Sequence, residues 1–173
     1  RSNRPEGFNL EFERPKPLVP RHLSFEVAER LNAKGEVLVP LDEAAVEALA
    51  ATLNGSGVEA IAICFLHSHA NPVHEKRAGE ILACACSDIF VTQSSDILRE
   101  YREYERMSTT ALNAYVGPRV KNYLDQLDRH LTGGKFGGTV QIMRSNGGTM
   151  SLGQARTEPV SMMESGPVAG MIG

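Results

Sequence analysis

A strand–helix–strand pattern between residues 58 and 92 constrains the fold of this chain more than any other feature. Residues 58–65 (VEAIAICF) are nearly all apolar, as expected for a strand buried on both faces of an α/β sheet. Asn71 and Pro72 then open a helix as its N-cap and first residue, and residues 89–92 are a second strand. Strands joined by such a crossover run parallel, so the pattern predicts a βαβ unit. The helix is expected to bury Val73, Ala78, Ile81, Leu82 and Ala85.

A hairpin and a helix are predicted before this unit. Polar and apolar residues alternate over 23–27, residues 32–35 (NAKG) form a turn, and residues 36–39 make a second strand. Asp42 caps a helix that ends at Gly55, in which Val46, Leu49, Ala50 and Leu53 recur at helical spacing. Residues 1–20 contain four prolines and little periodicity. They are predicted to be an extended arm or connection that precedes an α/β domain over residues 21–173.

A long helical region follows the βαβ unit. Its apolar stripe comprises Leu112, Tyr115, Val116, Val120, Tyr123, Leu124, Leu127 and Leu131. Gly117 and Pro118 interrupt this region, which predicts a kink, and Gly133-Gly134 ends it. Residues 140–143 are then a short strand that leads into the loop 144–148 (RSNGG).

Composition excludes several classes of protein. The chain is 42% hydrophobic and 23% charged, which is ordinary for a globular domain with a real core. Its net charge of -3 and the lack of a basic stripe argue against nucleic acid as a partner. No apolar stretch approaches the roughly 20 residues of a membrane span, and the polar N-terminus is unlike a signal peptide. Three cysteines with no C-x-x-C spacing suit neither zinc nor disulfides, which predicts a cytoplasmic setting.

The loop Ser145-Asn146-Gly147-Gly148 is the first candidate for chemistry. Ligands bind outside the carboxyl ends of strands in open α/β sheets, and glycines let backbone N–H groups approach an anion or a carbonyl oxygen. The alternative is a plain turn, because Asn-Gly is a common turn dipeptide.

Three other segments leave similar alternatives open. The charged run 99–106 is either a solvated, ion-paired helix face or a source of one arginine, Arg106, that holds a carboxylate or phosphate in a cleft. Ser165 and Gly166, followed by Pro, are either an anion-binding helix start or an ordinary capped helix. The cluster of His67, His69 and His74 lacks a carboxylate or cysteine to complete a metal site, so no metal is expected.

Taken in order, these segments resemble the ATP-dependent hydantoinase A/5-oxoprolinase family over essentially the whole chain. The segments that carry the resemblance are residues 20–30, 35–42 (GEVLVPLD), 62–75, 102–116 (REYERMSTTALNAYV), 142–148 (IMRSNGG) and 165–170 (SGPVAG). The family includes N-methylhydantoinases, 5-oxoprolinases and a subunit of acetone carboxylase.

The resemblance implies a ribonuclease H-like/actin-like ATPase fold, with a mixed sheet, in which ATP and Mg activate a ring carbonyl by phosphorylation. Family members hold the phosphates with two Asp-Gly-Gly-Thr-type loops. None of the glycine pairs here (Gly133-Gly134, Gly137-Gly138, Gly147-Gly148) follows an Asp. We therefore expect the 173 residues alone to bind no cofactor and to be inactive, and to be an internal part of a longer enzyme.

The implied substrate is a small cyclic amide of the hydantoin, N-methylhydantoin or 5-oxoproline type, and the implied partner is a hydantoinase B-type subunit or domain. Candidate substrate- or phosphate-binding residues are Ser145, Asn146, Gly147, Gly148, Arg106, Glu105 and Asn113, with Ser165 and Gly166 as hinge or helix cap. Two alternatives remain: a subunit of an ATP-dependent ketone carboxylase, and a non-catalytic scaffold that docks a partner subunit.

Overall fold

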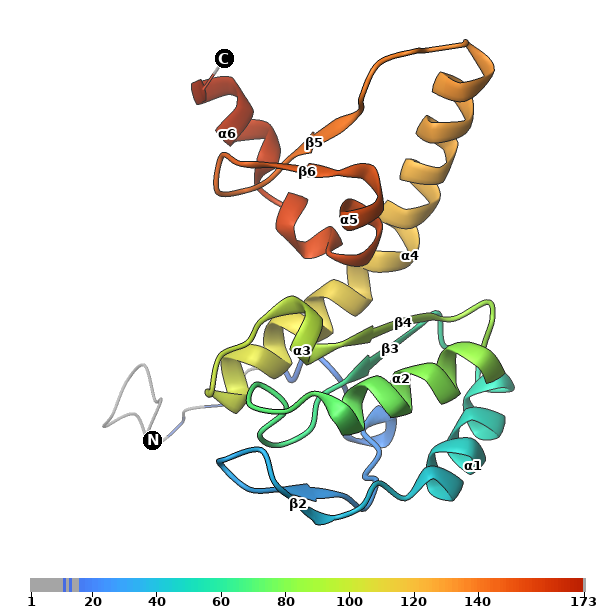
Figure 1. Ribbon diagram of the computed structural model, residues 1–173, viewed down its shortest axis with the longest axis vertical. Coiled ribbons are helices and arrows are strands. Elements are labelled where there is room, and N and C mark those ends of the chain that lie inside the picture. The colour runs from blue at the N-terminus through green and yellow to red at the C-terminus, as the bar shows by residue number, and fades with distance from the viewer. Residues whose placement is uncertain (1–10, 12, 14–15, 173) are drawn as a thin grey trace.

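The chain folds into two lobes joined by one long helix, α4 (Glu103–Gly133) (Figure 1). The computed structural model describes residues 11, 13 and 16–172, so most of the predicted arm over 1–20 lies outside the described residues. The first lobe holds the elements before α4, and the second lobe holds those after it. Figure 1 shows α4 running along the first lobe and then turning toward the second. The helix therefore belongs to both lobes.

The first lobe contains the predicted βαβ unit. Strand β3 (Ala60–Ile63) and strand β4 (Phe90–Gln93) are parallel, with Ala60 opposite Phe90, and α2 (Val73–Ala85) connects them. Helices α1 (Glu43–Asn54) and α2 pack on one face of this pair, and α4 contacts both strands. The core comprises Val46, Ala50, Leu53, Ile63, Ala78, Leu82 and Cys86. The α/β prediction is thus confirmed for this lobe.

The βαβ unit differs from the prediction in its burial. Ala62 is exposed rather than buried, and β3 pairs only with β4 among the described residues. Asn71 caps α2 as predicted, with its Oδ1 accepting the Val73 N–H at 3.1 Å. Val73 and Ala85, however, are exposed. The buried side of α2 carries His74 and Glu75 instead, which have polar partners inside the lobe.

The predicted hairpin forms, but its first strand lies later in the chain. Strand β1 (Arg30–Leu31) pairs with β2 (Val37–Val39) in antiparallel fashion, whereas residues 23–27 form no strand. Leu23 lies instead in a short 3-10 helix, η1 (Arg21–Leu23). The alternation at 23–27 was misleading because no described strand lies beside these residues. The turn is confirmed, since Asn32 Oδ1 accepts the N–H groups of Lys34 and Glu36 and Gly35 has a φ of 82°.

Helix α1 agrees closely with the prediction. Asp42 Oδ1 accepts the Ala45 N–H at 3.0 Å, the buried residues are Val46, Ala50 and Leu53, and Gly55 is the C-cap. Helix α4 ends at the Gly133-Gly134 pair, as predicted, and contains Pro118. Its predicted stripe is partly wrong, since Tyr115 and Tyr123 are exposed. The reason is that the buried residues of α4, such as Arg106, Gly117 and Leu124, share one helical face, and the two tyrosines lie outside it.

The second lobe is smaller. It contains the antiparallel pair β5 (Gln141–Met143) and β6 (Thr149–Ser151), then α5 (Leu152–Thr157), the 3-10 helix η2 (Pro159–Met162) and α6 (Ser165–Ile172). Leu124 of α4, Met150 and Ala155 form its buried core. The described strands thus make three separate pairs, and they do not join into the single mixed sheet that was expected. No helix in the described part of the chain is long and apolar enough to span a membrane.

Candidate functional site

The carboxyl ends of β3 and β4 lead into a group of buried polar residues, which we call the strand-end cluster. Its members are Glu75, Ser68, Ser94, Ser95 and Arg106, each at most 1% exposed. Glu75 accepts the Phe65 N–H at 2.7 Å and the Ser94 hydroxyl at 2.6 Å through Oε1, and the Ser95 N–H at 2.8 Å through Oε2. One carboxylate therefore ties together the segments that follow both strands. The cost of burying it is offset by three hydrogen bonds.

Arg106 enters the same cluster from α4. Its Nη2 donates to the Phe65 carbonyl at 2.7 Å, and its Nη1 donates to the Glu100 carbonyl at 3.4 Å and to Nδ1 of His69 at 3.2 Å. A guanidinium has only donors, so Nδ1 of His69 is the acceptor. Burial, Arg106 and His67 together lower the pKa of His69. Burial also raises the pKa of the neighbouring Cys64 thiol, which makes it a poor nucleophile.

These contacts change the interpretation of the charged run 99–106. Tyr101, Glu103 and Tyr104 are exposed, as in a solvated helix face, but Arg106 is not. Glu105 is half-buried and lies 3.6 Å from Arg102, and its backbone carbonyl accepts the Thr109 hydroxyl. A ligand-binding role for Arg106 or Glu105 stays a prediction.

Asn113 joins the two lobes. Its Nδ2 donates to Thr92 Oγ1 of β4 at 3.0 Å and to the carbonyl of Thr157 in α5 at 3.0 Å. Its Oδ1 accepts the Val160 N–H of η2 at 3.0 Å, and the residue is fully buried. Because these bonds use its donors and its acceptor, Asn113 fixes the second lobe on the first.

The predicted loop of residues 144–148 is a β-hairpin turn. Arg144 N–H donates to the Gly148 carbonyl at 2.7 Å, Gly148 N–H donates to Asn146 Oδ1 at 3.1 Å, and Gly147 has a φ of 87°. The rule for open parallel sheets does not apply, because β5 and β6 are antiparallel. The Ser145 hydroxyl donates to the Ser161 carbonyl at 2.9 Å and accepts the Glu164 N–H at 3.1 Å. These contacts favour the turn interpretation.

The segment at 165–167 starts a helix, as predicted. Ser165 is the first residue of α6 rather than its cap, a difference of one position. Gly166 is exposed, and a Cβ at this position would meet nothing within 4 Å. The hinge role of both residues stays a prediction.

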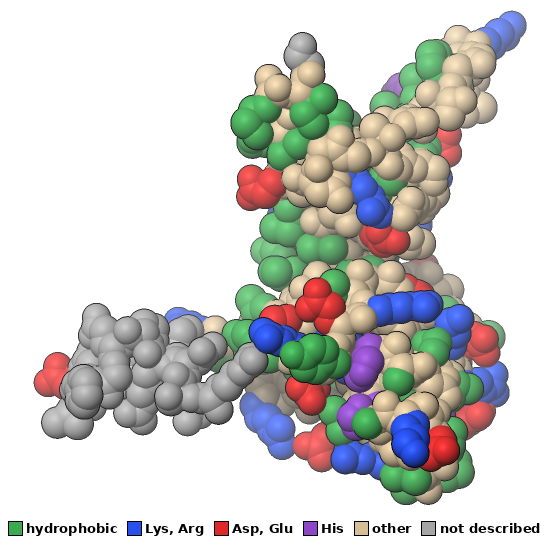
Figure 2. All heavy atoms as spheres, turned by 60° about the vertical axis from the view of Figure 1, so that its left-hand side comes forward, with side chains coloured by type: hydrophobic (Ala, Val, Ile, Leu, Met, Phe, Trp, Pro, Cys, Tyr) green, Lys and Arg blue, Asp and Glu red, His purple; other side chains and the backbone are tan. Residues whose placement is uncertain are grey.

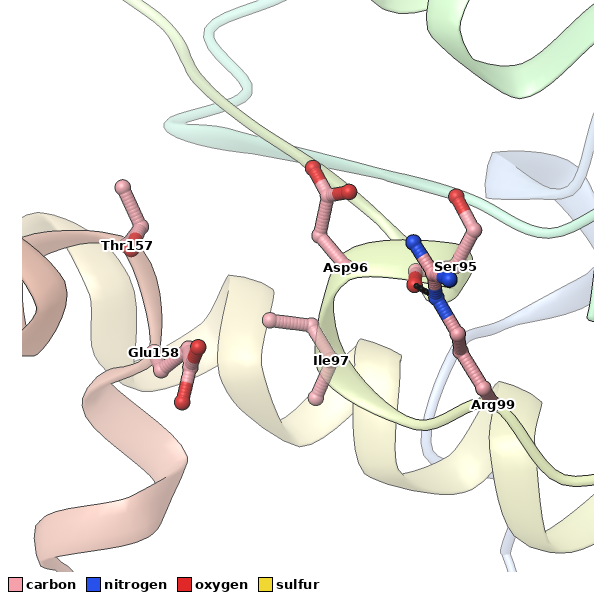
Figure 3. Close-up of a pocket in the computed structure, with 6 residues that line it drawn as sticks. All are labelled: Ser95, Asp96, Ile97, Arg99, Thr157 and Glu158. Atoms are coloured by element: carbon pink, nitrogen blue, oxygen red, sulfur yellow. Dashed lines mark hydrogen bonds between the residues drawn. The ribbon is translucent and has the colours of Figure 1, made fainter. Parts of the chain in front are cut away.

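A pocket lies where the lobes meet, and we call it the lobe-junction pocket. Ser95, Asp96, Ile97 and Arg99 form one wall, and Thr157 and Glu158 form the other (Figure 3). The first wall is α3 (Ser94–Ile97) with the residues after it, directly beyond the carboxyl end of β4. Glu158 is ion-paired with Arg144, which links the hairpin turn to a residue that lines this pocket. The candidate residues Ser145 to Gly148 and Arg106 do not line it.

The sequence analysis did not find this pocket. The position of Ser94–Ile97 after a parallel strand was a usable signal for one wall. No local signal marks Thr157 and Glu158, because their place opposite α3 depends on α4 and Asn113.

The histidines do not gather around a metal position. His74 Nδ1 lies 2.8 Å from Glu29 Oε2, and the ring centroids of His67 and His69 are 5.9 Å apart. Among the described residues, no group of three His, Cys, Asp or Glu side chains could hold a metal ion. On the face drawn in Figure 2, acidic and basic side chains are interspersed over the first lobe.

Comparison with known proteins gives the class of this chain. Residues 1–86 match the hydantoinase/oxoprolinase N-terminal region, and residues 106–173 match the hydantoinase/oxoprolinase domain. The chain belongs to the hydantoinase/oxoprolinase family.

Individual relatives span several activities. An uncharacterised protein of Methanocaldococcus jannaschii is 42% identical over 99% of this chain and 25% of its own length. The crystal structure of the ATP-dependent caprolactamase from Pseudomonas jessenii superposes with a TM-score of 0.83 at 32% identity, over 97% of this chain and 25% of that one. A nucleotide-free acetone carboxylase structure, described as ATP-dependent, gives a TM-score of 0.81 at 30% identity, over 92% and 23%. The chain thus spans about a quarter of these relatives.

Proposed function

We propose that these residues form part of an ATP-dependent hydrolase that opens cyclic amides of the hydantoin, N-methylhydantoin or 5-oxoproline type by phosphorylating a carbonyl oxygen. The observation that carries this proposal is the likeness to a caprolactamase, whose name describes action on a cyclic amide, along nearly the whole chain. The family assignment supports it. A ribonuclease H-like/actin-like ATPase fold for the whole enzyme is part of the same proposal.

The lining of the lobe-junction pocket does not suit the triphosphate of ATP. It carries the carboxylates of Asp96 and Glu158, which would repel a triphosphate, and only Arg99 lines it as a cation. The sequence has no Asp-Gly-Gly-Thr loop either. We therefore propose that other parts of the enzyme hold ATP and Mg, and that the 173 residues alone neither bind ATP tightly nor hydrolyse it. Saturable binding of Mg-ATP to the isolated chain would contradict this.

A second candidate function is a subunit of an ATP-dependent ketone carboxylase. The likeness to acetone carboxylase favours it, because its TM-score is almost the same as that of the caprolactamase. The two functions differ in what receives the phosphoryl group: an amide oxygen of a ring, or acetone or bicarbonate.

Turnover by the full-length protein separates the two functions. ATP-dependent ring opening of hydantoin, N-methylhydantoin or 5-oxoproline, followed by chromatography of the products, is the expected result. Consumption of acetone with bicarbonate, and no ring opening, would replace the hydrolase proposal with the carboxylase.

Partners and location are also proposals. The caprolactamase relative is named as a subunit alpha, and it is 35% identical over 88% of this chain and 22% of its own length. We propose that the full protein works with a hydantoinase B-type subunit or domain. The three cysteines of these 173 residues are all free, which supports a reducing, cytoplasmic location. Co-purification of the full-length protein with a second subunit tests the first point.

A further inference from the structure

We propose that the lobe-junction pocket binds the amide group of a cyclic amide, with Arg99 donating to the carbonyl oxygen and Asp96 or Glu158 accepting the ring N–H. This inference rests on the proposed hydrolase function, since it assigns that function's substrate to a specific pocket. It concerns residues outside the predicted site.

Both walls of the pocket are held in place by buried hydrogen bonds. Glu75 fixes the Ser95 N–H on one wall, and Asn113 fixes the Thr157 carbonyl on the other. Glu158 is held by Arg144 and by Gln154, whose Nε2 donates to its Oε1 at 3.2 Å. A binding site needs such support, because a ligand gains affinity when the groups that meet it are already ordered.

The lining offers donors that lack partners. Arg99 Nε donates to the Ser95 carbonyl at 3.1 Å, which orients the guanidinium, while its two Nη groups have no hydrogen-bond partner within the described residues. The Ser95 hydroxyl also lacks a partner there, but it is buried beneath the wall, so Arg99 supplies the donors that a ligand can reach. Free donors favour a ligand with an acceptor oxygen, such as a carbonyl group.

The lining also offers acceptors and an apolar surface. Asp96 Oδ2 accepts the Gln93 Nε2 at 2.6 Å, and the rest of its carboxylate is exposed at the pocket. Glu158 stands on the opposite wall, and the side chain of Ile97 extends from the first wall toward it (Figure 3). Carboxylates accept an N–H, and an aliphatic side chain suits the methylene groups of a small ring.

Charge decides between a neutral amide and an anion. The acidic side chains are Asp96 and Glu158, and the basic ones are Arg99 and, behind Glu158, Arg144. The lining itself thus carries two carboxylates and one guanidinium, and Arg144 neutralises Glu158 from outside it. A neutral ring that presents one N–H and one carbonyl matches this lining, whereas phosphate would meet two carboxylates.

The test measures direct binding to the full-length protein in the absence of ATP, with ligand-observed NMR as the method of detection. The probes are 2-pyrrolidone, N-methyl-2-pyrrolidone and inorganic phosphate. We expect Arg99→Ala, and Arg99→Gln as a second variant, to weaken 2-pyrrolidone binding about tenfold, because a hydrogen bond to a charged donor is lost. Arg119→Ala, an exposed arginine of α4, is the matched control and should bind like the unmodified protein. N-methyl-2-pyrrolidone, which lacks the N–H, should bind about tenfold more weakly.

Three results would overturn the assignment: no saturable binding of 2-pyrrolidone, equal binding by the Arg99 and Arg119 variants, or displacement of 2-pyrrolidone by phosphate. Ring opening by the full-length protein tests the proposed function separately from the pocket. Ring opening with an unchanged KM in Arg99→Ala would reject the pocket and keep the hydrolase. Arg99-dependent binding without any ring opening would keep the pocket and reject the hydrolase.

Discussion

The two lobes differ in the structure of the segments that follow their strands. In the first lobe, the segments after β3 and β4 are bonded to buried side chains of two helices, Glu75 of α2 and Arg106 of α4, which are 0% and 1% exposed. In the second lobe, the segment between β5 and β6 is a tight turn that leaves Asn146 and Gly148 exposed, and Ser145 ties it to Ser161 and Glu164.

This difference teaches where a site can form. Parallel strands end at the same edge and need long connections, so side chains from several helices meet there. An antiparallel pair needs only a short turn to connect its strands. Gly147 thus adopts the positive φ that the turn requires, and a ligand role for residues 145–148 stays a prediction. The less conspicuous Glu75 and Ser95 organise a pocket wall.

The largest effect is expected in the strand-end cluster of the first lobe. Glu75→Ala should lower the free energy of unfolding by about 3–5 kcal/mol, because the N–H groups of Phe65 and Ser95 lose their acceptor. Urea denaturation measures this. Glu80→Ala, on the exposed side of the same helix, is the control and should cost about 0.5 kcal/mol or less. Similar losses of stability for both variants would mean that the buried hydrogen bonds of Glu75 do not stabilise the fold more than a surface carboxylate does.

The next effect concerns the link between the regions. Asn113→Ala should cost about 2–3 kcal/mol, because it leaves the Val160 N–H and the Thr157 carbonyl without their partner. Hydrogen exchange should become faster at Val160 and elsewhere in the second lobe while β3 and β4 stay protected. Asn122→Ala, on the exposed face of α4, should leave exchange unchanged. Uniform loss of protection in both lobes would contradict the conclusion that Asn113 fixes the second lobe on the first.

A smaller effect is expected in the hairpin turn. Gly147→Ala should cost about 1–2 kcal/mol, because φ is 87° and the new Cβ would lie 2.8 Å from Ile172 Cδ1. Thermal unfolding of Gly147→Ala beside Gly153→Ala, which has no close contact, measures it. If Gly147→Ala also abolished substrate binding while stability was kept, the turn would have a ligand role after all.

The smallest effect is a pH dependence from His69. Its pKa is lowered by burial, Arg106 and His67, against a smaller opposing effect of Glu103, so the unfolded chain binds the proton more readily. Stability should therefore fall by less than about 1 kcal/mol as pH drops below roughly 6.5, the ordinary histidine pKa. Unfolding at pH 7.5 and 5.5 measures this fall. His69→Gln should reduce it, whereas His22→Gln, on the exposed η1, should leave it in place.

The sequence by itself determined the local units. The βαβ order, the Asp42 cap, the Asn71 cap and the end of α4 at Gly133-Gly134 follow from patterns a few residues long, and all appear in the structure. The family assignment also came from ordered local motifs. The prediction failed at 23–27, where the pattern was local but the partner strand was not.

Only the tertiary structure decided the candidate site. Arg106 lies in a run that looks solvated, yet it is buried because α4 crosses the loop after β3. Asn113 is a link between lobes, and Thr157 and Glu158 face Ser95 and Arg99 across a pocket. These pairs are far apart in the chain. Their meeting depends on how α4 packs against both lobes, and no short pattern of residues encodes that arrangement.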